Sequence, residues 1–226
     1  LYEVTARYME VEGEPYVLEL VKRMDDNYMI DEKQRDKLLR HFGGYHEQLY
    51  KDALTGAYNR RYFEEKIRKS TVSAGVAMID LDDFKLYNDS FGHDTGDVVL
   101  ITFVNIIKNC TRKTDMLIRY GGDEFLLIMP GIKEQDFKNK LLQILEEVRR
   151  ADVPGHGGLR LSASIGGVLS NGSVIEDAIG RADKLMYQAK NRKNMVVTED
   201  NLVADGIKKG MLHDREKIRQ LILIVD

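Results

Sequence analysis

The stretch that decides the fold is "IRYGGDEFLLIMP", residues 118–130. Two apolar segments, "DMLIRY" and "FLLIMP", flank a short Gly-Gly-Asp-Glu turn. Segments joined by so few residues cannot be linked by a crossover connection, so they are predicted to form an antiparallel β-hairpin. The packing of a hairpin does not require two glycines and two carboxylates here, and the turn is therefore predicted to bind a ligand.

Helical and strand patterns alternate before this hairpin. "FEEKIRK" (63–69) has the pattern of a helix, and "VSAGVAMID" (72–80) that of a buried strand. The next helix is predicted from an apolar stripe made of Val99, Phe103, Ile106 and Cys110.

The alternation continues after the hairpin, with helices predicted over 137–148 and 182–189 and strands over 159–169 and 195–197. The resulting order is β-α-β-β-α-β. It predicts an α/β (α+β) fold in which helices pack on a central mixed sheet, with the hairpin turn at the active site.

The segments outside residues 52–198 are expected to belong to neighbouring domains. Residues 1–30 alternate loosely around Gly13 and Pro15, which predicts a β-hairpin at the tail of an upstream sensory sheet domain, PAS-like in type. Residues 199–226 are interpreted as a linker and the first strand of a response-regulator receiver domain, because the chain stops at "LILIVD". Both ends are therefore expected to have been cut from a larger protein.

Residues 31–51 are predicted to form a linker helix, with Leu38, Phe42, Tyr45 and Leu49 on one face. Two interpretations stay open. The helix either packs on its own domain or forms a signalling stalk that pairs two protomers; fewer than three heptads are visible.

Composition excludes several classes of partner. The 226 residues carry a net charge of -3, so a basic field for a nucleic-acid polymer or a polybasic patch for anionic lipid is not expected. The longest apolar run, Leu221 to Val225, is far shorter than the roughly 20 residues needed to span a bilayer, and no membrane contact is expected within this fragment. A single cysteine, Cys110, fits a reducing, cytoplasmic location.

Three carboxylates are predicted to meet at the turn. Asp80 ends the strand "VAMID", and Asp123 and Glu124 come close to it if the hairpin lies alongside. Like charges at this distance repel unless a cation joins them, and hard oxygen ligands suit Mg²⁺. Gly121 and Gly122 would let main-chain N–H groups approach a phosphate. Taken alone, such a turn is more often an ordinary hairpin loop.

Five blocks in one order change that interpretation. They are "DALTGAYNRRYFEE" (52–65), "IDLDDFKLYNDSFGHDTGDVVL" (79–100), "RYGGDEF" (119–125), "SASIG" (162–166) and "ADKLMYQAK" (182–190). Together they closely resemble the GGDEF family of diguanylate cyclases, over about Asp52 to Val197.

The resemblance implies a reaction in which two GTP molecules condense to cyclic di-GMP with loss of two pyrophosphates. Each 3′-hydroxyl attacks the α-phosphate of the other nucleotide, so the working site forms between two protomers of a homodimer. Two Mg²⁺ ions per active site are implied, with Mn²⁺ as a substitute.

The resemblance also assigns the acidic residues. Asp80 and Asp123 are implied as metal ligands, together with the main-chain carbonyl of Leu81. Glu124 takes the place of the family's essential acid, as a metal ligand or as the general base for the 3′-hydroxyl. Asp82 is interpreted as a solvated or capping residue, because strand alternation points it away from Asp80.

Contacts to the triphosphate are implied for two regions. Main-chain N–H groups at Asp83, Phe84 and Lys85 would meet the β- and γ-phosphates, with the lysine adding charge. Phe84 has core packing as its alternative role. Lys190 matches a phosphate-contacting lysine, but the chain then departs from the family pattern and reads "AKNRKNMV". The next basic position falls on Asn194 without a gap, or on Lys193 with one residue deleted.

Asn88 and Asp97 match the pair that reads guanine. An aspartate can accept from N1–H and the 2-amino group of guanine, and adenine would leave those acceptors unpaired. The alternative for Asp97 is a charge at the start of a helix, favoured by the helix dipole.

Arg112 and Asp115, in "TRKTD", precede the hairpin. An exposed pair at this spacing is usually a modest surface contact. In the GGDEF family an Arg-x-x-Asp at this distance resembles an inhibitory site for the product, and product inhibition is therefore expected. Two rival roles stay open: a catalytically weak domain that serves as a receptor for GTP or cyclic di-GMP, and a signalling relay between the flanking domains.

Overall fold

The computed structural model describes residues 2–11, 14–23, 48–199 and 204–205 in two units, Leu1–Tyr50 and Lys51–Asp226. The first unit holds an antiparallel hairpin of β1 (Tyr2–Val11) and β2 (Glu14–Arg23), as the sequence predicts. The predicted linker helix over 31–51 falls largely on residues 24–47, and the predicted receiver strand lies at the end of the chain. The predicted strand and residues 31–47 of the predicted helix lie outside the described residues, whereas residues 48 and 49 are helical.

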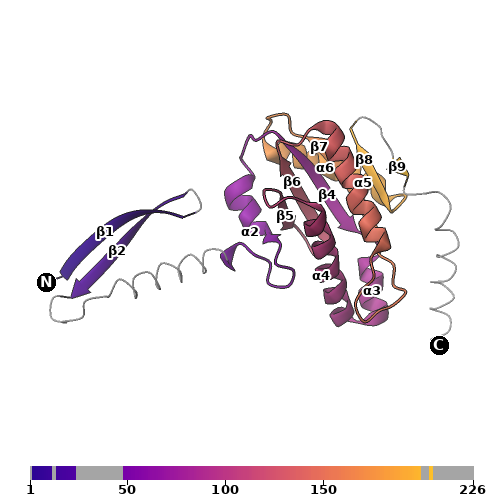
Figure 1. The fold of residues 1–226 in the computed structure, drawn as a ribbon, viewed down its shortest axis with the longest axis horizontal. Coiled ribbons are helices and arrows are strands. Elements are labelled where there is room, and N and C mark those ends of the chain that lie inside the picture. Colours follow the sequence, from indigo (N-terminus) through magenta and orange to yellow (C-terminus); the bar gives the residue numbers. More distant parts are fainter. Residues whose placement is uncertain (1, 12–13, 24–47, 200–203, 206–226) are drawn as a thin grey trace. The chain divides into compact units, whose positions relative to one another are not determined.

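The second unit is built on a seven-stranded mixed sheet in the order β3-β5-β6-β4-β7-β8-β9 (Figure 1). The strands are β3 (Tyr58–Asn59), β4 (Ala74–Leu81), β5 (Met116–Arg119), β6 (Glu124–Pro130), β7 (Ala163–Leu169), β8 (Met195–Thr198) and β9 (Ala204–Asp205). β4 lies at the centre, antiparallel to both β6 and β7, whereas β7 and β8 are parallel. The predicted central mixed sheet and the β5–β6 hairpin are confirmed.

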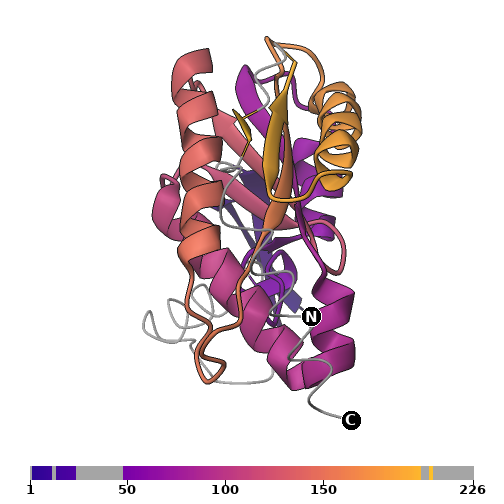
Figure 2. The same cartoon turned by 90° about the vertical axis from the view of Figure 1, so that its right-hand side faces the viewer.

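Helices cover both faces of this sheet (Figure 2). They are α2 (Arg60–Tyr62), the π-helical turn η1 (Phe63–Ile67), α3 (Phe84–Phe91), α4 (His93–Cys110), α5 (Glu134–Arg150) and α6 (Ile175–Lys190). Apolar residues of α4 and α5 pack on one face, and those of η1 and α6 pack on the other. Among the described residues, no helix has the length and apolar character needed to cross a membrane.

The predicted helix stripe in α4 needs one correction. Val99, Phe103 and Cys110 are buried, but Ile106 is only half-buried and Ile107 is fully buried in its place. Both positions still contact the same core cluster. The short helix α3 carries apolar side chains at Phe84, Tyr87 and Phe91, but none of them is fully buried, and eight residues are too few for a clear periodic pattern.

The register of the sheet fixes the edge where the site forms. Asp80, near the end of β4, pairs with Glu124 of β6 on one side and with Ser164 of β7 on the other. Residues paired directly across a sheet point to the same face. Their side chains therefore share the face that carries α6.

Candidate functional site at the end of β4

Asp80 is a buried carboxylate at the centre of this edge. Its exposed fraction is 1%, and its Oδ2 accepts a hydrogen bond of 2.7 Å from Nζ of Lys190, at the end of α6. Its Oδ1 is buried and has no hydrogen-bond partner among the described residues. A buried oxygen without a partner is costly, so Asp80 is suited to accept a further cation or donor.

The hairpin turn brings the other two carboxylates beside Asp80. Glu124 is its cross-strand partner, and the main-chain carbonyl of Asp123 accepts from the N–H of Leu81 at 3.2 Å. A Cβ on Gly121 would lie 2.9 Å from Oε2 of Glu124, so glycine leaves room for that carboxylate in this position. The structure therefore brings together the predicted Asp80, Leu81, Asp123 and Glu124.

Negative charge is disfavoured at Asp80, because the side chain is buried and other carboxylates lie nearby. Burial raises the pKa of Asp80 to about 6, because the loss of hydration outweighs the bond to Lys190 and because Asp123 and Asp82 add negative charge. Partial burial disfavours the Lys190 ammonium, but the contact with Asp80 outweighs this effect and raises the pKa of Lys190. A bound cation would relieve the repulsion among the carboxylates.

The donor set fits a hard divalent cation. Asp80 offers its unpartnered Oδ1, and Asp123 and Leu81 add a carboxylate and a main-chain carbonyl. Within the described ranges, no three His, Cys, Asp or Glu side chains gather tightly enough to enclose a metal unaided. A cation bound here would need further ligands from water or from a bound anion.

Asp82 differs from its sequence interpretation. It is 1% exposed rather than solvated. Its Oδ1 accepts from the hydroxyl of Ser164 at 2.7 Å, and its Oδ2 accepts from the main-chain N–H of Asn194 at 2.9 Å. Asp82 therefore ties the end of β4 to β7 and to the turn that follows α6, and does not cap a neighbouring helix.

The hydrogen bond between Asp82 and the main chain of Asn194 orients the divergent "NRKN" turn, residues 191–194. Asn194 is buried against Asp82, whereas Lys193 forms an ion pair with the carboxylate of Asp83. Asp83 has a left-handed φ of 60° and immediately precedes α3. Lys193 and Lys190 thus place two ammonium groups against Asp83 and Asp80, at the same end of β4.

The predicted guanine residues lie on two adjoining helices. Asn88 is on α3 and is half-buried, and Asp97 is exposed on α4. The helices approach so closely that a Cβ on Gly96 would lie 1.9 Å from Oδ1 of Asn88. Phe84 packs against the core while Lys85 is exposed, so both of the roles considered for Phe84 stay compatible with its position.

From the sequence, no role was predicted for Arg119, whose side chain contacts the Gly-Gly-Asp-Glu turn. Its guanidinium lies 3.2 Å from Oδ1 of Asp52 and donates at 2.8 Å to the carbonyl of Gly122. Asp52 in turn accepts from the main-chain N–H and hydroxyl of Thr55. The Asp-x-x-Thr spacing in "DALT" was a usable signal, because such residues often form turns closed by the side chain.

Arg112 and Asp115 lie apart from this edge. The Asp115 carboxylate accepts from the main-chain N–H of Arg112 at 2.7 Å, and Arg112 is exposed. Both residues line a cavity of about 250 Å³, to which Lys51, Lys108 and Lys113 contribute. The cavity is therefore strongly basic on one side.

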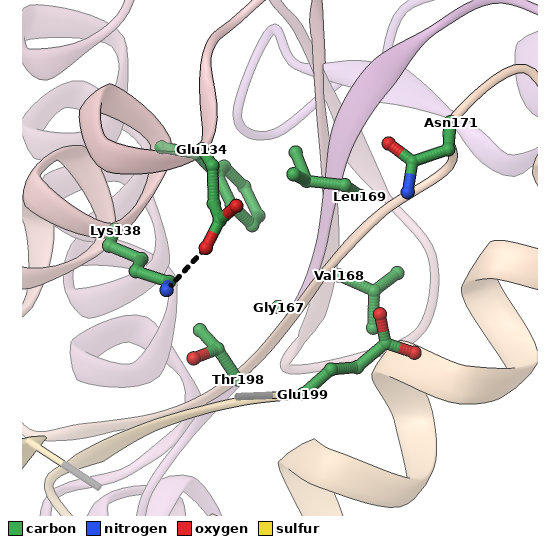
Figure 3. Close-up of a pocket in the computed structure, with 9 residues that line it drawn as sticks. Glu134, Lys138, Gly167, Val168, Leu169, Asn171, Thr198 and Glu199 are labelled. Carbon is green, nitrogen blue, oxygen red and sulfur yellow. Dashed lines mark hydrogen bonds and ion pairs between the residues drawn. The ribbon is translucent and has the colours of Figure 1, made fainter. Parts of the chain in front are cut away.

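Two other cavities flank the sheet. One of about 410 Å³ opens beside Glu124 and is lined by Arg60, Arg68, Tyr120 and Asp183, among others. A smaller one, of about 110 Å³, lies at the end of β7 away from Asp80 (Figure 3). There the ion pair between Glu134 and Lys138 faces Thr198.

The family model for "Diguanylate cyclase, GGDEF domain" matches residues 49–195. The probable diguanylate cyclase DgcT of Escherichia coli is 34% identical over 162 residues, which cover 67% of this chain and 36% of DgcT. This chain thus spans about a third of the length of that relative.

Solved structures agree with the family match. Diguanylate cyclase SiaD of Pseudomonas aeruginosa, solved with its activator SiaC, gives a TM-score of 0.65 at 31% identity, over 74% of this chain and 68% of that one. The GGDEF domain of DgcB from Caulobacter crescentus, solved with c-di-GMP, gives 0.61 at 26% identity, over 67% and 96%. With its sheet, its hairpin turn and its ordered motifs, this chain belongs to the GGDEF family.

Proposed function

We propose that this domain is a diguanylate cyclase, which condenses two GTP molecules into cyclic di-GMP and two pyrophosphates. The observation that carries the proposal is the pairing of Asp80 with Glu124 across β4 and β6, with an unpartnered carboxylate oxygen and two lysines at the same edge. Family membership and the names of relatives such as DgcT and SiaD support it.

In each half-reaction, the 3′-oxygen of one GTP forms a bond to the α-phosphorus of the other. The α–β phosphoanhydride bond breaks, pyrophosphate leaves, and the hydroxyl proton passes to Glu124 or to solvent. Asp80, Asp123 and the carbonyl of Leu81 would hold Mg²⁺, which when bound would neutralise charge and lower the pKa of the attacking hydroxyl. Glu124 acts either as a further metal ligand or as the general base for the 3′-hydroxyl.

The basic groups orient the triphosphate. Lys190 and Lys193 pair with carboxylates in the nucleotide-free domain and are positioned to exchange them for phosphate oxygens. Main-chain N–H groups at the start of α3, together with Lys85, bind the β- and γ-phosphates. Gly121 and Gly122 admit the nucleotide close to the backbone, since a Cβ on Gly122 would meet open space.

Asn88 and Asp97 select guanine. Each protomer binds one GTP, so catalysis requires a homodimer in which two half-sites face each other. Cyclic di-GMP inhibits the enzyme at Arg112 and Asp115. An arginine fork matches O6 and N7 of guanine, and the basic cavity of about 250 Å³ beside it suits an anionic ligand.

The test of catalysis is chromatographic analysis of nucleotides after incubation with GTP and Mg²⁺ at several protein concentrations. Cyclic di-GMP that rises more steeply than linearly with protein is the expected result. Glu124→Gln should abolish it, and Glu147→Gln, an exposed substitution on α5, should not. A verified dimer that binds GTP but forms no product would instead favour the receptor role.

Product inhibition has its own test. Arg112→Ala is expected to remove inhibition by added cyclic di-GMP while turnover of GTP continues. Arg150→Ala, at an arginine side chain that is 65% exposed on α5, is the matched control and should leave inhibition intact. Inhibition that is unchanged in Arg112→Ala would rule out this site.

A further inference from the structure

Contacts within α3, the helix that carries Asn88, contribute little to holding it in position. α3 is eight residues long, and none of its side chains is fully buried. Asp83, at its N-cap, makes no side-chain capping bond within the described part of the chain. Isolated helices of this length are unstable in water, so contacts with other elements must hold α3.

Two such contacts come from the loop of residues 151–162, which joins α5 to β7. The hydroxyl of Tyr87 donates a hydrogen bond of 2.7 Å to the main-chain carbonyl of Arg160. One helical turn further on, the ring of Phe91 meets the ring of His156 edge-on, with centroids 6.5 Å apart. Both contacts lie on the helix that carries Lys85 and Asn88.

The loop itself is anchored firmly enough to act as a support. Val153 and Leu161 are each 1% exposed and belong to the main core cluster. The loop carbonyl of Ser162 accepts from the main-chain N–H of Asp82 at 2.9 Å, which ties the loop to the end of β4. The carbonyl of Arg160 is therefore a fixed acceptor beside the site.

The hydroxyl of Tyr87 keeps its proton at neutral pH and can therefore donate this hydrogen bond. Burial, with the nearby carboxylates of Asp83 and Asp82, raises the pKa of the Tyr87 phenol well above its usual range. Loss of this hydrogen bond would let α3 tilt against α4. Oδ1 of Asn88 occupies the space that a Cβ on Gly96 would need, so a tilt would shift Asn88 relative to Asp97, the residue after Gly96.

We propose that Tyr87 is a positioning residue for guanine recognition: its bond to the Arg160 carbonyl holds α3 so that Asn88 and Asp97 act on one base. This inference rests on the proposed function. It assigns to the 151–162 loop a role in base selectivity without contact with the nucleotide.

The experiment compares Tyr87→Phe with the unaltered domain. Binding is measured with GTP and ITP analogues that carry a methylene bridge between the α- and β-phosphorus, so that no turnover occurs. ITP lacks the 2-amino group of guanine and reports on base reading alone. Tyr87→Phe should weaken binding of the GTP analogue about three- to tenfold and lower its preference over the ITP analogue.

The rate at saturating GTP should stay the same while KM rises. Arg160→Ala is the matched control, because it keeps the main-chain carbonyl and should leave both affinities unchanged. His156→Ala removes the ring contact and should give a smaller loss in the same direction. Unchanged affinity in Tyr87→Phe, equal losses for both bases, or an Arg160→Ala effect as large as that of Tyr87→Phe would overturn the proposal.

These results separate the two proposals. A domain that binds the GTP analogue but makes no cyclic di-GMP would contradict the proposed function, while the affinities would still decide the role of Tyr87. A domain that binds neither analogue would overturn both.

Discussion

The ammonium Nζ of Lys190 lies 2.7 Å from Oδ2 of Asp80, so the last residue of α6 is tied to the end of β4. The Asp80 side chain is 1% exposed, whereas that of Lys190 is 46% exposed. Lys190 therefore provides a positive charge that a buried carboxylate needs when no cation is bound. Under the proposed function, a cation at Asp80 would release this ammonium group to contact a phosphate.

Lys190→Met should accordingly destabilise the metal-free domain. The substitution keeps the length of the side chain but leaves the Asp80 carboxylate without its ammonium partner, at an expected cost of about 1 to 3 kcal/mol in the free energy of unfolding. Urea unfolding in the presence of a chelator measures the loss. Mg²⁺ should restore part of it, since a cation at Asp80 would replace the missing charge.

Lys184→Met, at an exposed position of the same helix, is the control and should change the free energy of unfolding by no more than about 0.5 kcal/mol. A Lys190→Met domain as stable as the unaltered one would contradict the role given to this ion pair.

The ion pair between Arg119 and Asp52 gives a pH-dependent prediction. Burial alone would raise the pKa of Asp52, but the hydrogen bonds from Thr55 and the charge of Arg119 outweigh it and lower the pKa below 3.8. A lowered folded-state pKa adds stability above the unfolded-state value, and this stability is lost as the pH falls through the folded-state pKa. Asp52→Asn should thus cost about 0.5 to 1 kcal/mol at pH 7.

That cost is expected to stay level from pH 7 to about pH 5 and to shrink as the pH falls below 3.8 and on through the lowered folded-state pKa of Asp52. Thermal unfolding of both proteins across this range measures it. A difference that persists in full at pH 3 would assign the cost to geometry rather than to charge.

Hydrophobic periodicity predicts the sheet and most of its helices, because each of those elements buries a regular stripe of its own. The sequence interpretation of Asp82 was wrong, because the contacts of Asp82 depend on residues that are distant in the sequence. Its partners, Ser164 and Asn194, are 82 and 112 residues away, and only the assembled sheet brings them to it. The alternation argument was also wrong, because residues two apart in a strand point to the same face. The bond of Asp82 to Ser164, which pairs with Asp80 across β4 and β7, shows that the two carboxylates share that side.

The same limit applies to the divergent turn after α6. The spacing of "AKNRKN" left Lys193 and Asn194 as alternatives for the basic position. The bond from the Asn194 N–H to Asp82 leaves Lys193 beside Asp83, so the geometry favours the alignment with one residue deleted. The tertiary contacts thus support Lys193 over Asn194, and its role toward phosphate stays a prediction.

Gly166, in the "SASIG" block, marks the closest approach of β7 to α6. A Cβ there would lie 2.1 Å from the carbonyl oxygen of Ala182 and 2.2 Å from the nitrogen of Met186, both main-chain atoms. Gly166→Ala should force α6 away from the sheet and lower the free energy of unfolding by about 2 to 3 kcal/mol. Urea unfolding would show the loss.

Gly180→Ala is the matched comparison on α6, because a Cβ there would meet nothing within 4 Å. It should stabilise the domain by up to about 1 kcal/mol through helix propensity. Equal effects of the two substitutions would contradict the close approach of β7 and α6.

Lys193 combines a strained backbone with a charge directed at the site, and the two can be separated. Its φ of 58° lies in the left-handed region, which costs a non-glycine residue about 1 kcal/mol. Its ion pair with Asp83 is half-exposed and contributes little to stability. Lys193→Gly should therefore leave the free energy of unfolding unchanged or raise it by up to about 1 kcal/mol.

The affinity of Lys193→Gly for GTP, in contrast, should fall. Loss of the ammonium should weaken binding several-fold at low salt, and the difference should narrow as salt screens the phosphate charge. Lys193→Asn, which tolerates the left-handed conformation but carries no charge, should show the same loss of affinity. Glycine and asparagine variants that bind GTP as tightly as the unaltered domain would place the triphosphate away from this turn, because a lysine that contacts phosphate cannot be removed without cost.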